Sequence, residues 1–134
     1  MKRQLARENA FLLLFEGAAN KDTDVNQIFE LATTERELEY DAYVEKVYFG
    51  VYENIEKIDA IISECSLGWK SERISNVSRA ALRLAVYELS MIEDIPTKVS
   101  INEAIELSKK YDDEKAYLFV NGVLNRAAEK LGKK

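Results

Sequence analysis

Apolar residues recur every three or four positions through most of the chain, which is the spacing of one face of an α-helix. The clearest segments of this kind cover residues 3–18, 25–32, 38–65, 77–92, 100–111 and 114–131. Glycine is sparse and Pro96 is the only proline, whereas strand-based folds need frequent turn residues. We therefore expect an all-α fold, a compact bundle of about seven helices, with a single domain over residues 1–134.

The longest segment, 38–65, has a seam of apolar residues with alternating spacings of four and three. The seam consists of Val44, Tyr48, Val51, Ile55, Ile58, Ile62 and Cys65. Such a seam is typical of a helix packed along its length against another helix. Two interpretations stay open: this helix is central to the core of a monomer, or it forms a coiled-coil homodimer.

Polar residues with capping chemistry precede the predicted helices. The candidates are Asp24, Asn76 and the capping-box pairs Thr34–Glu37 and Ser100–Glu103. We expect Leu5, Leu12 and Leu118 to face the core, Trp69 to anchor a loop against it, and Cys65 to be a buried thiol.

Composition narrows the function classes. Apolar residues make up 47% of the 134 residues and charged residues 32%, which is ordinary for a globular domain. The single cysteine and the absence of histidine exclude an intrachain disulfide, the usual zinc sites and the commonest general base. Neither a run of about 20 apolar residues nor a signal-peptide pattern is present. We expect a cytoplasmic protein that is not an enzyme and needs no cofactor.

Charge is unevenly distributed although the net charge is −5. Residues 16–64 hold thirteen acidic and four basic side chains, whereas residues 98–134 hold eight basic and six acidic ones. Binding of phosphate depends on the local field rather than on the total charge. A basic face and an acidic face are therefore compatible with this sequence, and so are ordinary solvated helix surfaces.

Several stretches, taken together and in order, resemble the NusB family. They are RAALRLAVYEL at 79–89, DIP at 94–96, VSINEAIEL at 99–107, FVNGVL at 119–124 and, at the other end of the chain, ARENA at 6–10. The resemblance implies two packed helical subdomains. It also implies binding of the boxA RNA element of ribosomal-operon leaders, jointly with the small ribosomal-subunit protein NusE, within an antitermination complex on RNA polymerase.

With that resemblance in place, cations are the candidates for holding RNA phosphates, and aromatic or amide side chains are the candidates for meeting bases. The candidate RNA-binding residues are Lys2, Arg3, Arg7, Arg79, Arg83, Lys98, Lys115, Phe119 and Asn121. Lys115 stands where the family commonly has an acidic residue. We expect cations from both ends of the chain to converge on one groove.

Structural roles compete with these assignments. Arg83 is also suited to an ion pair with a carboxylate such as Glu103, and Lys115 to one with Asp112. Phe119 is also suited to the core, and Asn121 to bridging two helices. For the whole protein, the alternatives are a protein-interaction module whose acidic middle contacts a basic partner, and a homodimer that hides the RNA face.

Overall fold

The computed structural model describes residues 1–68 and 73–133, and within them it contains seven α-helices and no β-strand. The helices are α1 (Arg3–Ala19), α2 (Val25–Thr34), α3 (Ala42–Glu53), α4 (Ile55–Cys65), α5 (Asn76–Met91), α6 (Thr97–Tyr111) and α7 (Ala116–Lys130). The expected all-α class is confirmed. Trp69, the expected anchor, lies outside the described residues.

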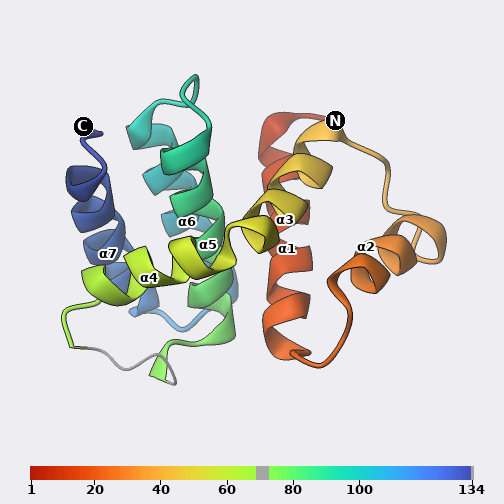
Figure 1. The fold of residues 1–134 in the computed structure, drawn as a ribbon, viewed down its shortest axis with the longest axis horizontal. Coiled ribbons are helices and arrows are strands. Elements are labelled where there is room, and N and C mark those ends of the chain that lie inside the picture. The colour runs from red at the N-terminus through yellow and green to blue at the C-terminus, as the bar shows by residue number, and fades with distance from the viewer. Residues whose placement is uncertain (69–72, 134) are drawn as a thin grey trace.

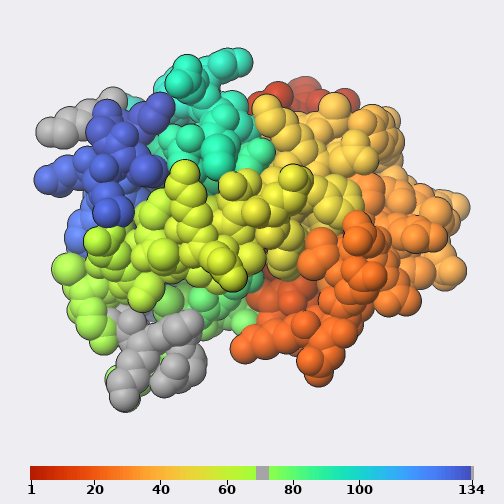
Figure 2. Space-filling model, in the orientation of Figure 1, coloured from red at the N-terminus to blue at the C-terminus, as the bar shows by residue number. Residues whose placement is uncertain are grey.

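The helices form two packed groups (Figure 1). α1, α2 and α3 make up the N-terminal subdomain, and α4 to α7 make up the C-terminal subdomain. α5 is the central element, because it packs against α1 and α3 as well as against α4, α6 and α7. In the space-filling view, α3 and α4 lie across one face of the molecule and cover the junction of the two groups (Figure 2).

The segment 38–65 is two helices, so the prediction of one long helix was wrong. α3 starts after Asp41, whose carboxylate accepts hydrogen bonds from two N–H groups of the first turn. The break falls at Asn54, which donates to the Gly50 carbonyl through both its backbone N–H and its side-chain amide. The Thr34–Glu37 pair forms no capping box, since Thr34 ends α2 and the cap of α3 is Asp41.

The apolar seam is nevertheless buried within the monomer. Its buried members are Val44, Tyr48, Val51, Ile58, Ile62 and Cys65, and Ile55 is half-buried. α3 and α4 both pack on α5, and α3 also packs on α1. These contacts support a central core helix pair over a coiled-coil homodimer.

Other helix starts follow local chemistry closely. Asp24 caps α2 as expected, by accepting a hydrogen bond from a first-turn N–H group. The cap of α5 is Ser75 rather than Asn76. α6 starts directly after Pro96, which is its N-cap, rather than at Ser100, whose hydroxyl donates to Glu88 instead of capping a helix.

Most predicted apolar faces are in the core, with three exceptions. Leu5, Leu12 and Leu118 are 51%, 39% and 56% exposed, so their expected burial was wrong. Cys65 is a buried free thiol as expected, and burial raises its pKa. None of the helices in the described ranges has the length and apolar character of a membrane span. Within the same ranges, no group of three metal-ligating side chains is placed to hold an ion.

Candidate nucleic-acid interface

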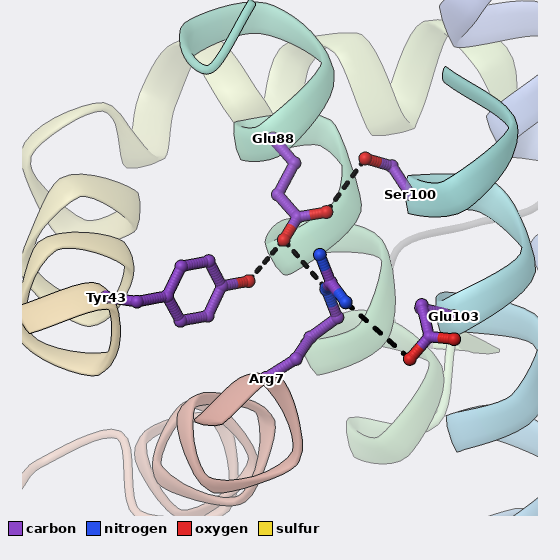
Figure 3. Close-up of polar contacts among 5 residues, drawn as sticks. All are labelled: Arg7, Tyr43, Glu88, Ser100 and Glu103. Carbon is purple, nitrogen blue, oxygen red and sulfur yellow. Dashed lines mark hydrogen bonds and ion pairs between the residues drawn. The ribbon is translucent and has the colours of Figure 1, made fainter. Parts of the chain in front are cut away.

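Arg7 points into the interior, where it meets a buried carboxylate (Figure 3). Arg7 is only 4% exposed, and its Nε donates to Glu88 Oε2 at 2.9 Å, while a second guanidinium nitrogen lies 3.6 Å from a Glu103 oxygen. Glu88 is fully buried and also accepts hydrogen bonds from the Tyr43 hydroxyl and, at 2.8 Å, from the Ser100 hydroxyl. This Glu88 network joins α1, α3, α5 and α6, and so it ties the two subdomains together.

Two titratable side chains that face Glu88 have raised pKa values. Burial alone would lower the pKa of Arg7, but the hydrogen bond and charge of Glu88 outweigh it and the pKa is raised. Burial, together with the charge of Glu88, raises the pKa of Tyr43 well above its ordinary value. Arg7 is therefore a cation that forms an ion pair in the interior. The sequence had instead placed it among the candidate RNA-binding residues.

Lys2 and Arg3 are the exposed cations at the start of α1. The Arg3 guanidinium carbon lies 4.3 Å from the centre of the Tyr43 ring, within the range of a cation–π contact. Arg3 lines a hollow of about 630 Å³ that also contains Lys46 and Pro96.

Arg79 and Arg83 lie near the start of α5, where they line a second hollow of about 500 Å³ together with Lys21. Arg83 donates from Nε and one terminal nitrogen to the two carboxylate oxygens of Asp59, at 2.9 and 2.8 Å. The expected competing ion pair of Arg83 thus exists, but with Asp59 rather than Glu103. Burial lowers the pKa of Arg79, and the charge of Arg83, which lines the same hollow, lowers it further.

Lys115 and Phe119 line a third hollow, of about 640 Å³, together with Arg73 and Arg126. Ile74 borders both this hollow and that of Arg79, so the two are neighbours on one surface. We call this the α5 amino-terminal surface, defined by Lys21, Arg73, Arg79, Arg83, Lys115, Phe119 and Arg126. Among the described residues that line its two hollows, six are cationic and three are acidic.

Sequence reasoning missed three cations of this surface. Lys21 follows the end of α1, Arg73 precedes α5, and Arg126 lies on α7, where its Nε donates to the Cys65 carbonyl at 2.7 Å. Arg126 was within reach of the sequence, because it follows Phe119 by seven residues and so shares its helix face. Lys21 and Arg73 lie outside the helices, where periodicity says nothing about direction.

Lys98 and Asn121 line a fourth hollow, of about 330 Å³, between α6 and α7. Lys98 belongs to the first turn of α6 rather than to the loop before it. The Asn125 amide donates to the side-chain carbonyl of Asn121 at 3.1 Å, so this contact lies within one helix. Asn102 and Lys133 border the same hollow.

The predicted residues therefore fall at two ends of the molecule, and the expectation of one shared groove was wrong. Arg3 lies near the N-terminus, at the same end as the C-terminus, whereas the turn between α6 and α7 lies at the opposite end (Figure 1). The 17 residues of α1 span about 25 Å between Arg3 and the region of Lys21. Sequence patterning could not show this, because it does not give the direction in which each helix runs.

Comparison with known proteins agrees with this fold. The model of the NusB family matches residues 4–129. The transcription antitermination protein NusB of Bacillus subtilis is 47% identical over 125 residues, covering 93% of each chain. The protein of the same name from Clostridium botulinum is 44% identical, covering 97% of this chain and all of its own.

Solved structures give the same result. The structure of T. maritima NusB is 38% identical, with a TM-score of 0.85, and covers 97% of this chain and 92% of its own. A structure of the antitermination factors NusB and NusE in complex with dsRNA contains a chain that is 31% identical, with a TM-score of 0.84 and 96% of both chains covered. The chain belongs to the NusB family.

Proposed function

We propose that this protein is a non-catalytic transcription antitermination factor that binds boxA RNA jointly with NusE, within an antitermination complex on RNA polymerase. Support comes from the name shared by its relatives and from the solved complex of NusB and NusE with dsRNA. The similarity extends along nearly the whole chain, and the family match includes all residues of the α5 amino-terminal surface.

The α5 amino-terminal surface is the best candidate for the RNA contact. The observation that carries this assignment is the clustering of Lys21 and Arg79 in one hollow, beside a neighbouring hollow with Lys115 and Phe119. Arg83 lines the first hollow too, but its charge is paired with Asp59. Single-stranded RNA is held by cations along the phosphates and by aromatic side chains against the bases, and both kinds are present here.

Lys2, Arg3, Lys98 and Asn121 are proposed as outlying contacts. Arg3 lines the hollow at the other end of α1, with Lys2 next to it in the sequence, and Lys98 and Asn121 line the hollow between α6 and α7. Only a longer RNA that crosses the molecule would meet them. We leave Arg7 out of the proposed contacts, since its charge is paired with Glu88 in the interior.

A titration of labelled boxA RNA, with a scrambled RNA as control and with and without NusE, tests the proposal. At about 50 mM salt, where phosphate contacts are strong, we expect binding that weakens steeply as salt is added. NusE should tighten binding of boxA more than of the scrambled RNA, because it extends the contact surface. If boxA RNA binds neither alone nor with NusE under these conditions, the proposal is refuted.

A further inference from the structure

Asp112, in the turn between α6 and α7, accepts two hydrogen bonds from the start of α5. The Ser75 hydroxyl donates to Asp112 Oδ2 at 2.6 Å, and the Ser78 hydroxyl donates to the same oxygen at 2.9 Å. Ser75 is also the cap of α5, since its oxygen accepts a hydrogen bond from the Ser78 N–H at 3.0 Å. The carboxylate thus completes the cap of one helix from a turn more than thirty residues away in the sequence.

These contacts join the two halves of the α5 amino-terminal surface. The first turns of α5 carry Arg79 and Arg83, whereas the turn that contains Asp112 leads directly to Lys115 and Phe119. Ser75, Ser78 and Asp112 all line the hollow that contains Lys115. Both hydrogen bonds run directly from α5 to that turn.

We propose that Asp112 is a positioning residue for RNA binding. It fixes the turn that leads to Lys115 and Phe119 against the amino terminus of α5, so that the cations on both sides of this contact meet the same RNA strand. This inference rests on the proposed function. Asp112 would not touch RNA in this role. The negative charge of its carboxylate is also attracted to the positive end of the α5 dipole, and this attraction stabilises the first turn of the helix.

Removal of Asp112 should change RNA affinity in one direction if the residue acts through its charge alone and in the other direction if it positions the surface. A carboxylate beside a phosphate-binding surface repels RNA, so its removal should tighten binding if Asp112 does nothing else. If Asp112 positions the surface, its removal should weaken binding even though a negative charge is lost. Glu114 is the matched control, because it is an exposed acidic residue in the same turn.

The experiment measures binding of boxA RNA, in the presence of NusE, by wild type, Asp112→Ala, Asp112→Asn and Glu114→Ala. We expect Asp112→Ala to bind at least about threefold more weakly, on the scale of a lost helix cap. Asp112→Asn keeps an acceptor for the serine hydroxyls and should bind within about twofold of wild type or more tightly. Glu114→Ala should bind as tightly as wild type or more tightly.

A further variant separates positioning from loss of fold. Ser78→Ala removes one of the two hydrogen bonds and leaves every charge in place, so we expect weaker RNA binding with a melting temperature close to that of wild type. The inference is overturned if Asp112→Ala, or Ser78→Ala where Asp112→Ala does not fold, binds RNA as tightly as wild type. Absence of boxA binding by the wild-type protein would instead refute the proposed function.

Discussion

Removal of the Arg7 side chain should test the Glu88 network more severely than any surface change. Arg7→Ala leaves the Glu88 carboxylate fully buried, with hydrogen bonds from Tyr43 and Ser100 but without its paired cation. Breaking a buried ion pair on one side typically costs about 3–5 kcal/mol, because an uncompensated charge stays in the interior. For a domain of this size, such a loss lowers the melting temperature by about 10–20 °C.

Arg3→Ala is the matched control for this prediction. Arg3 lies one turn earlier on α1 and contacts the same Tyr43 ring, but it is exposed and forms no ion pair with a carboxylate in the described part of the chain. Its removal should cost at most about 1 kcal/mol, the scale of an exposed cation–π contact. Urea unfolding followed by far-UV circular dichroism measures both free energies of unfolding.

The two arginines should also separate by their effect on RNA. With its charge used in the interior, Arg7 should influence RNA binding through stability alone, so the folded fraction of Arg7→Ala should keep most of its affinity. A loss of stability in Arg7→Ala no larger than that in Arg3→Ala would refute the burial argument. A large loss of RNA affinity in fully folded Arg7→Ala would return this residue to the RNA contacts.

Two further predictions concern packing and pH. Gly50→Ala should lower the free energy of unfolding by about 1–3 kcal/mol, because the new Cβ would collide with the hydroxyl oxygen and two ring carbons of the buried Tyr87 side chain. Gly122→Ala, whose new Cβ meets only the guanidinium of Arg126 at 3.4 Å, should be neutral or stabilising. Equal melting temperatures for the two variants would contradict the close approach at Gly50. The hydrogen bond from Lys110 lowers the pKa of Glu8, so Glu8 stabilises the fold above its ordinary pKa and this contribution is lost as the pH falls through the lowered value. The melting temperature should therefore fall less in Glu8→Gln than in wild type between about pH 5 and about pH 3, and parallel curves would rule this out.

The periodicity of apolar residues was sufficient to locate most of the helical segments, because each helix buries a continuous apolar face. It failed at Asn54, where the break depends on polar contacts to Gly50 while the apolar spacing continues across it. It failed again at Leu5 and Leu118, which lie at the edge of an apolar stripe and whose burial depends on whether a neighbouring helix extends that far.

The candidate site was less predictable, since charged residues look alike until tertiary packing separates them. Arg3 and Arg7 lie four residues apart on one helix, yet only Arg7 meets Glu88. Glu88 itself carried a signal, because it interrupts the otherwise apolar run 84–89, and an acidic residue buried there needs a partner. The pairing of Arg83 with Asp59 depends on the packing of α4 against α5, which the sequence pattern does not reveal.

If the RNA backbone crosses the α5 amino-terminal surface, the salt dependence of boxA binding shows it most directly. For single strands, each phosphate contact contributes about 0.7 to the slope of log K against log salt concentration. Lys115→Asp should weaken binding at low salt and reduce the magnitude of the slope by at least about 0.7, whereas Lys98→Asp, at the other end of the molecule, should change it by less. If Lys115→Asp leaves the affinity and the slope unchanged while Lys98→Asp abolishes RNA binding, the RNA does not cross the α5 amino-terminal surface.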